Sequence, residues 1–437
     1  MQVQEIRNKR VTVAGLGRFG GGIAVARWLV ENGATVLVTD QAPPEKLAAS
    51  VAKLDGLPVE FRLGEQRESD FKNADVVVAS PAFSPTNPYL SIARSAGVPV
   101  TTEIKLFVER CPATIVGVTG TKGKSTTTAM LGKILQTQFP TWVGGNIGGS
   151  LLPDLHRIDA THVAVLELSS YMLHYLGDMR WSPHVALVTL IARDHVEWHG
   201  SESEYREAKK NIVRHQRPDD FAVLCAEEEG SLSFASCTRA RVVHYGITNR
   251  RGFDLRVPGR HNQLNAQGAF AAAALLGVSF DQAQSALADF PGLPHRLQLV
   301  HESAAGVRYY NDSIATIPEA AVAALDSFPP KRVIQIVGGH DHGIPLTAMC
   351  NALVEKAKAV LCIGATGKKV VEVMSQAAHQ GGAAVYDCGD LATALKMARS
   401  VAAPGDVVLL STGFKSYDQF ANFEERGEAF AKLAAEP

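Results

Sequence analysis

The chain has 437 residues, 46% of them hydrophobic and 20% charged, and its 43 Lys and Arg against 44 Asp and Glu give a net charge of −1. This length predicts about three domains, and the balanced charge argues against a polyanion such as DNA as the main partner. No apolar run reaches the roughly 18–20 residues of a membrane span, and the amino terminus lacks the apolar core of a signal peptide. The six cysteines form no CxxC pair. We therefore expect a cytoplasmic protein without membrane or nucleic-acid partners.

Short β-branched runs alternate with helical patterns along the whole chain, which predicts an α/β fold with parallel sheets. We place the domain junctions near Cys111 and in the Gly- and Pro-rich segment before Leu297, which gives domains 1–111, 112–296 and 297–437. The expected strands are Val11–Ala14, Thr35–Asp40, Asp75–Ser80, Ala113–Val118, Val163–Leu168, Val185–Leu190, Val333–Val337, Ala359–Ile363, Ala384–Tyr386 and Val407–Leu410.

The first strong motif is Gly-Val-Thr-Gly-Thr-Lys-Gly-Lys-Ser-Thr at 117–126, between an expected strand and a helix over 125–135. Glycines let several backbone amides point at one phosphate chain, and the helix adds its positive end. Lys124 would reach the outer phosphates and the Ser125 hydroxyl would bind Mg²⁺. Val118 stands where the strict P-loop pattern has glycine, so an ordinary glycine-rich turn is the alternative.

Polar residues at the ends of later strands are candidates for a metal site. Glu167 ends one strand, and Asp194 and His195 follow the next, at the edge where α/β sheets bind ligands. The alternative for Glu167 is a capping or surface residue, and the alternative for His195 is an ordinary loop histidine without a functional role. Lys209 lies in a helical stretch, where periodicity alone favours a solvated face.

The glycines at 15, 17 and 20 follow the first strand, and Asp40 ends the second. This spacing matches the dinucleotide fingerprint, a glycine loop plus an acid that binds ribose. It supports a rival hypothesis, an NAD-dependent oxidoreductase. The second, stronger phosphate loop favours instead a pyrophosphate attached to a different nucleoside.

Seven sequence blocks follow one another in order and span nearly the whole chain: Gly117–Thr126, Glu167–Ser170, Asp194–His195, His261–Asn265, Leu293–Arg296, Asn311–Ser313 and Phe423–Gly427. In this order the blocks resemble those of the Mur ligases, the ATP-dependent amino-acid ligases of peptidoglycan synthesis. The short amino-terminal domain, the Asn-Asp-Ser block and the carboxyl-terminal block are most similar to the member that adds glutamate to UDP-N-acetylmuramoyl-L-alanine.

The resemblance implies a Rossmann-like UDP-sugar domain, a central P-loop ATPase domain and a Rossmann-like glutamate domain, in a monomer that uses ATP and Mg²⁺. The catalytic residues would be Lys124, His195 and Lys209, the last carbamylated by CO₂. Metal ligands would be Ser125, Glu167, His195 and the Lys209 carbamate. ATP would contact Gly120, Thr121, Lys122, Gly123, Lys124, Ser125, Thr126, Asn265, Arg296 and Asp312. The UDP-sugar would contact Gly17, Arg18, Asp40, Asn146 and Ser169.

The implied mechanism activates the substrate carboxylate as an acyl phosphate, which the glutamate amine then attacks. Orientation and electrostatics would supply the rate without a side-chain nucleophile. Candidates for glutamate binding are Thr316, Ser416 and Phe423, with plain packing as the alternative.

The chain departs from the family pattern at two lysines that help to recognise D-glutamate. One follows Asn-Asp-Ser, where this sequence has Ile314, and the other is replaced by His342 in the segment 338–343. A variant of this ligase adds L-glutamate and depends on a separate epimerase. We therefore expect L-glutamate, with D-glutamate as the alternative.

Overall fold

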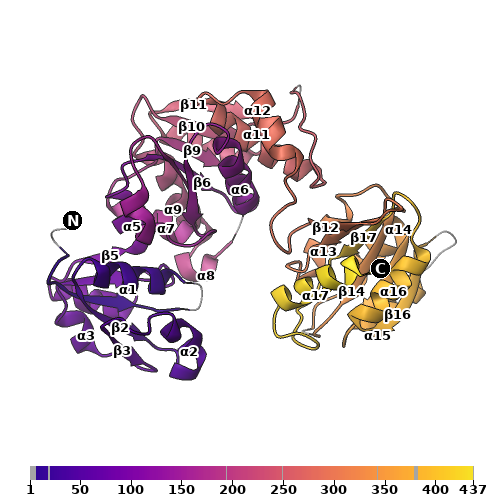
Figure 1. The fold of residues 1–437 in the computed structure, drawn as a ribbon, viewed down its shortest axis with the longest axis horizontal. Helices are drawn as coiled ribbons and strands as arrows, with labels where there is room; N and C mark the ends of the chain where they lie inside the picture. The colour runs from indigo at the N-terminus through magenta and orange to yellow at the C-terminus, as the bar shows by residue number, and fades with distance from the viewer. Residues whose placement is uncertain are drawn as a thin grey trace. The chain divides into compact units, whose positions relative to one another are not determined.

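In a computed structural model, residues 6–17, 20–192, 194–248, 250–341, 343–377 and 382–436 are described. They form three sheets dominated by parallel strands, which confirms the predicted α/β fold class (Figure 1). The chain divides into two compact units, residues 1–252 with 264–286, and residues 253–263 with 287–437. The first unit holds two sheets and the second holds the third, while the predicted junctions at 111 and 297 stay predictions.

The first sheet has the order β3-β2-β1-β4-β5 and is parallel throughout. Helices cover both faces, because α1 packs on one side, and α3 and α4 pack on the other. The strands are β1 (Arg10–Ala14), β2 (Thr35–Asp40), β3 (Val59–Leu63), β4 (Val76–Ala79) and β5 (Val100–Thr102), and the helices are α1 (Gly21–Glu31), α2 (Pro44–Ala52), α3 (Glu68–Lys72), α4 (Pro88–Ser95) and α5 (Glu103–Val108).

The second sheet has the order β11-β10-β9-β6-β8-β7 and is also parallel. Its strands are β6 (Thr114–Thr119), β7 (Thr141–Gly145), β8 (Val163–Glu167), β9 (Val185–Val188), β10 (Phe221–Cys225) and β11 (Arg241–Tyr245). The accompanying helices are α6 (Lys124–Leu135), η2 (Leu152–Arg157), α7 (Ser170–Asp178), α8 (Val196–His199), α9 (Glu202–Arg214), α10 (Glu229–Leu232), η3 (Ser233–Cys237), α11 (Arg260–Ala274) and α12 (Phe280–Ala288). One continuous apolar cluster, from Ile6 to Phe234, joins this sheet to the first.

The third sheet has the order β12-β13-β17-β14-β15-β16, in which only β12 and β13 are antiparallel. Two apolar clusters fill its two faces. Its strands are β12 (Gln298–Glu302), β13 (Arg308–Asn311), β14 (Val333–Gly338), β15 (Ala359–Ile363), β16 (Ala384–Gly389) and β17 (Val407–Leu410), and its helices are α13 (Pro318–Leu325), α14 (Thr347–Lys356), α15 (Gly367–Ala377), α16 (Leu391–Val401) and α17 (Phe423–Ala435). Across the described ranges, every helix is too short or too polar to cross a bilayer.

Candidate active site at the carboxyl ends of the central strands

The phosphate loop connects β6 to α6 and needs glycine at two positions. Gly120 has φ 154° and Gly123 has φ 85°, values that side chains with a Cβ rarely adopt. A Cβ on Gly120 would lie 1.9 Å from Thr189 Oγ1, and one on Gly123 would lie 2.6 Å from Asn265 Oδ1. The loop therefore brings bare backbone to the start of α6, the arrangement that binds phosphate.

Side chains of the loop and of α11 meet at the start of α6. Lys124 Nζ donates to the Thr121 carbonyl oxygen at 3.1 Å. Thr127 Oγ1 donates to Asn265 Oδ1 at 3.2 Å, 138 residues away in the sequence. Asn265, expected at the ATP site, thus lies beside the phosphate loop.

Glu167 ends β8, whose neighbour β6 leads into the phosphate loop. Its side chain is fully buried, and Oε1 accepts a hydrogen bond from Asn146 Nδ2 at 2.7 Å. Among the described residues Oε2 has no hydrogen-bond partner. A buried carboxylate oxygen without a donor is costly, and a divalent cation would satisfy it, so this residue fits the expected magnesium site.

Lys209, in α9, does not lie on a solvated helix face, because its side chain is only 2% exposed. Its Nζ donates to the Gly120 carbonyl oxygen at 2.7 Å and to Thr119 Oγ1 at 3.3 Å. Burial, and next the nearby charge of Lys124, hold the pKa of Lys209 well below its usual range. An amine held in this way is available in its neutral, nucleophilic form.

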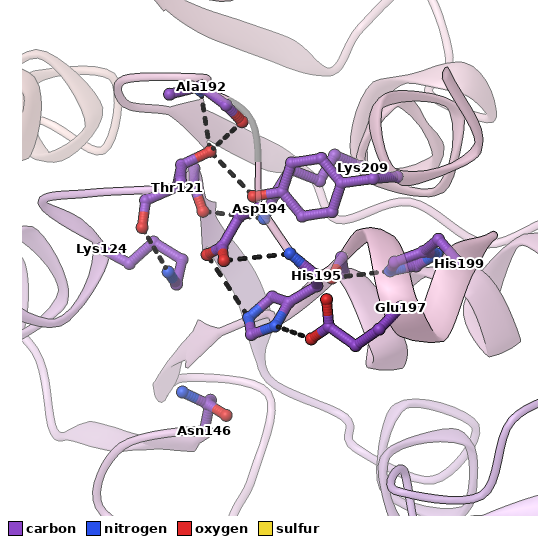
Figure 2. Close-up of polar contacts among 12 residues, drawn as sticks. Thr121, Lys124, Asn146, Ala192, Asp194, His195, Glu197, His199 and Lys209 are labelled. Carbon is purple, nitrogen blue, oxygen red and sulfur yellow. Dashed lines mark hydrogen bonds and ion pairs between the residues drawn. The ribbon is translucent and has the colours of Figure 1, made fainter. Parts of the chain in front are cut away.

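Asp194 lies near enough to Lys209 for its charge to act on the lysine, and His195 follows it in the chain (Figure 2). His195 has a left-handed backbone conformation, φ 47°, and its Nε2 lies 3.4 Å from Asp194 Oδ2, while Nδ1 lies 3.8 Å from Glu197 Oε1. Its ring packs against that of Tyr171, with centroids 5.0 Å apart. No group of three His, Cys, Asp or Glu in the described parts of the chain could hold a metal ion by itself. This pattern suits Mg²⁺, which commonly takes one or two carboxylates and completes its shell with phosphate oxygens and water.

The amino-terminal glycine loop is held by Asp40. Its Oδ2 accepts from the amides of Leu16 at 2.9 Å and Gly17 at 3.1 Å, and its Oδ1 accepts from Ala42 at 2.9 Å. The carboxylate expected to bind the ligand thus shapes the loop around it. Gly17 has φ 62°, and Arg18 lies outside the described residues.

The other two residues expected at the UDP-sugar have partners within the first unit. Asn146 reaches Glu167 twice, through its side chain and through its amide, which donates to the Glu167 carbonyl oxygen at 2.9 Å. Ser169 caps α7, because its Oγ accepts from the Met172 amide at 3.2 Å.

Three of the sequence blocks converge in the second unit. Asn311 Nδ2 donates to the Gly427 carbonyl oxygen at 3.0 Å and lies 3.1 Å from His295 Nδ1. Arg426, which the sequence analysis did not single out, is 1% exposed and donates to Ser313 and to the Phe414 carbonyl oxygen. Burial lowers its pKa to about 10. Its signal in the sequence was its place directly after Glu424 and Glu425, inside the block Phe423–Gly427.

Asp312 is buried and uses both carboxylate oxygens within the same unit. Oδ1 accepts from the Leu297 amide at 3.1 Å and Oδ2 from Ser411 Oγ at 2.7 Å. Burial raises its pKa to about 7, despite opposing hydrogen bonds and the charge of Arg296. Arg296 itself is exposed, so only one of these two expected ATP contacts faces solvent.

Hydrogen bonds join the segments that carry the expected glutamate-binding residues. The Gly413 amide donates to the Ala315 carbonyl oxygen at 2.9 Å, and Ser313 Oγ donates to that of Phe423 at 2.8 Å. Thr316 and Phe423 are partly exposed and Ser416 is buried. His342 lies outside the described residues.

A glycine-built phosphate loop, a buried carboxylate at the end of the neighbouring strand and a buried lysine that contacts the loop define a nucleotide-dependent enzyme of the P-loop class. Three family models match the chain: "Mur ligase MurD-like, N-terminal domain" at 9–102, "Mur ligase middle domain" at 118–255 and "Mur ligase, glutamate ligase domain" at 295–413. The chain belongs to the Mur ligase family, whose members are ATP-dependent, amide-bond-forming ligases. This membership decides against the NAD-dependent oxidoreductase.

Curated relatives match the chain over nearly its whole length. A Roseiflexus protein is 41% identical over 98% of this chain and 99% of its own, and one from Symbiobacterium thermophilum is 36% identical over 97% of both. Each is named UDP-N-acetylmuramoylalanine–D-glutamate ligase.

Solved structures show the same fold at low identity. UDP-N-acetylmuramate-alanine ligase from Thermotoga maritima is 22% identical with a TM-score of 0.61, over 97% of this chain and 99% of its own. MurF from Acinetobacter baumannii is 16% identical with a TM-score of 0.56, over 100% of this chain and 93% of its own.

Proposed function

We propose that this chain joins D-glutamate to UDP-N-acetylmuramoyl-L-alanine with hydrolysis of ATP to ADP and phosphate. The observation that carries the proposal is the 41% identity, over nearly the full length of both chains, to a relative named for this reaction. The names of the relatives support D-glutamate, the alternative of the sequence analysis, better than the L-glutamate that we expected. Six unpaired cysteines and the need for ATP fit a reaction in the cytosol.

The first unit would bind ATP and Mg²⁺ through the residues around the phosphate loop. Glu167 Oε2 lacks a donor among the described residues, and we assign it to Mg²⁺ together with Ser125, His195 and a carbamate on Lys209. Bound Mg²⁺ would neutralise phosphate charge during transfer. Lys124, at the start of α6, would stabilise the charge on the transferred phosphoryl group.

Lys209 would form its carbamate from CO₂. The neutral amine attacks the carbon of CO₂, a C–N bond forms, and one proton leaves to solvent. The burial of the side chain and the low pKa of its amine support this step. The resulting anion would turn a group that repels Mg²⁺ into one that attracts it.

The residues of the second unit would orient glutamate for attack on the acyl phosphate. The substrate carboxylate takes the γ-phosphoryl group of ATP and releases ADP, and the glutamate amine then displaces phosphate. Thr316, Ser416 and Phe423 remain our candidates for holding glutamate, and Arg296 and Asp312 for the nucleotide. Hydrogen bonds among the segments that carry the first three support that grouping.

One observation favours L-glutamate as a second candidate substrate. Ile314 follows Asn-Asp-Ser, and its side chain can neither donate a hydrogen bond nor balance a carboxylate. If L-glutamate were the substrate, a separate epimerase would have to supply the D isomer.

The test is release of ADP from ATP with UDP-N-acetylmuramoyl-L-alanine and each glutamate isomer in turn. Because an unpaired buried carboxylate costs several kcal/mol, we expect about 10³-fold preference in kcat/KM for D-glutamate. Preference for L-glutamate would overturn the isomer and leave the ligase standing. Absence of glutamate-dependent ADP release would overturn the ligase itself.

A further inference from the structure

Tyr205 is a buried residue near the start of α9 whose hydroxyl reaches the phosphate loop. Its side chain is 1% exposed, and its hydroxyl oxygen lies 2.8 Å from Thr121 Oγ1. The two residues are 84 positions apart in the sequence. Helix α9 and the phosphate loop are therefore joined by a partly buried hydrogen bond between side chains.

The other contacts of Thr121 fix the direction of that hydrogen bond. Thr121 Oγ1 accepts from the Ala192 amide at 2.9 Å and donates to the Ala192 carbonyl oxygen at 3.0 Å (Figure 2). A hydroxyl has only one hydrogen to donate, so Tyr205 must donate to Thr121. Thr121 thus joins three segments: the phosphate loop, α9, and the segment after β9 that leads to Asp194 and His195.

Lys209 lies one turn beyond Tyr205 on the same face of α9. Its Nζ lies 5.0 Å from the centroid of the Tyr205 ring and donates to the Gly120 carbonyl oxygen at 2.7 Å. Two neighbouring side chains of one helix therefore hold two consecutive loop residues, Gly120 and Thr121. The carbonyl of Thr121 in turn accepts from Lys124 Nζ at 3.1 Å.

We propose that Tyr205 is a positioning residue for nucleotide binding, whose hydroxyl holds Thr121 and the following loop in the conformation that receives the phosphates of ATP. The proposal rests on the proposed function for the identity of the nucleotide. Tyr205 has no role in the chemical step, because it acts through Thr121.

The first test is Tyr205→Phe, which keeps the ring and removes the hydroxyl. The dissociation constant of ATP with Mg²⁺ is measured by calorimetry, together with KM for each substrate. One hydrogen bond is worth a factor of about 3 to 10, so we expect ATP to bind that much more weakly, with the KM for glutamate and for the UDP-sugar unchanged. Unchanged affinity for ATP, or an equal rise of all three KM values, would overturn the proposal.

A second variant, Thr121→Val, separates positioning from general loss of packing. It leaves the Tyr205 hydroxyl buried without its acceptor, so adding Tyr205→Phe should not weaken ATP binding further. Multiplied effects in the double variant would show that the two side chains act independently, and would overturn the proposal.

The matched control is Tyr245→Phe. Tyr245 is also buried in the first unit, at 3% exposed, and its hydroxyl donates to the Val188 carbonyl oxygen at 3.2 Å. We expect its loss to leave ATP affinity unchanged, and equal weakening in both variants would count against a specific role for Tyr205. The KM values require ligase activity, whereas the calorimetric affinity for ATP does not, so a failure of this proposal can be told apart from a failure of the proposed function.

Discussion

Glu167 and Lys209 are two buried ionisable side chains: Glu167 ends β8 of the central sheet, and Lys209, in α9, contacts the phosphate loop. Stability alone would not favour either of these residues in a buried position, because burying a charged group costs more free energy than burying an apolar side chain there. One has an oxygen without a donor among the described residues, and the other has a strongly lowered pKa. A buried lysine with a lowered pKa beside a glycine-rich loop is typical of a functional site.

We predict that Lys209→Ala loses nearly all ligase activity, because the variant cannot form the anionic carbamate. A small carboxylate or halide added to the assay should restore part of the rate by supplying a negative charge. Steady-state ADP release with and without the added anion is the measurement.

Lys210→Ala is the matched control, since this neighbouring lysine forms an ion pair with Glu207, with N and O 2.8 Å apart. We expect it to retain full activity. Full activity of Lys209→Ala would remove the carbamate from the mechanism.

At the scale of elements, each site lies in the loop that follows a parallel strand. The glycines allow the sharp turns of these loops, and distant side chains then hold them in place. Asp40 holds the loop after β1, and Lys209 and Tyr205 together hold the loop after β6. The loop conformation therefore depends on contacts that local sequence does not contain.

We predict that Asp40→Asn raises the KM for the UDP-sugar about as much as Asp40→Ala, roughly tenfold, and leaves the KM for ATP unchanged. The reason is that both carboxylate oxygens accept from backbone amides, whereas asparagine offers only one acceptor. Substrate titrations of both variants measure this.

Asp55→Asn, an exposed carboxylate of the same domain, should leave both KM values unchanged. A rise in the KM for ATP in the Asp40 variants would show that the two nucleotide sites are assigned the wrong way round.

Local pattern made most elements predictable, whereas a weakly patterned hairpin and a side chain buried by a long-range contact were missed. The strand expected at Val163–Leu168 was found at Val163–Glu167. It was predictable because an apolar run followed by polar residues is a signal contained in the local sequence. The hairpin of β12 and β13 was not predicted, since Gln298–Glu302 is only partly buried and mixes polar with apolar residues. The burial of Lys209 could not be predicted either, because its acceptor Gly120 is 89 residues away.

The whole molecule consists of two units with separate apolar clusters, so its unfolding need not be a single transition. The second unit contains two buried carboxylates with opposite pKa shifts. Asp312 has a raised pKa. Asp406 has a lowered pKa, because hydrogen bonds from Lys358 and the Ala403 amide outweigh its burial.

We predict that Asp312 makes the second unit less stable as pH rises from about 4 to 7. Its pKa is about 7 in the folded state and about 3.9 in the unfolded chain, so the folded state holds a proton that the unfolded state has lost. Asp312→Asn should remove this dependence, which is of order 2–4 kcal/mol. Denaturant unfolding of both proteins at pH 5 and pH 8 measures it.

Asp406→Asn is the control for this prediction. A carboxyl with a lowered pKa loses its contribution only as pH falls through that pKa, so the difference between this variant and the unmodified protein should be the same at pH 5 and pH 8. An equal pH dependence in Asp312→Asn and the unmodified protein would contradict the assignment.

The contact between Asn265 and the phosphate loop sets an order of events during synthesis. Thr127, the hydrogen-bond partner of Asn265, is 138 residues away, and a ribosome adding about 5–20 residues per second needs roughly 7–30 s to span that interval. During that time the nascent chain contains the whole glycine motif but does not yet contain Asn265, whose side chain lies beside that motif in the folded protein. Cellular ATP therefore meets a finished phosphate loop only after α11 has been made, and it cannot stabilise the emerging amino-terminal half through this contact before then.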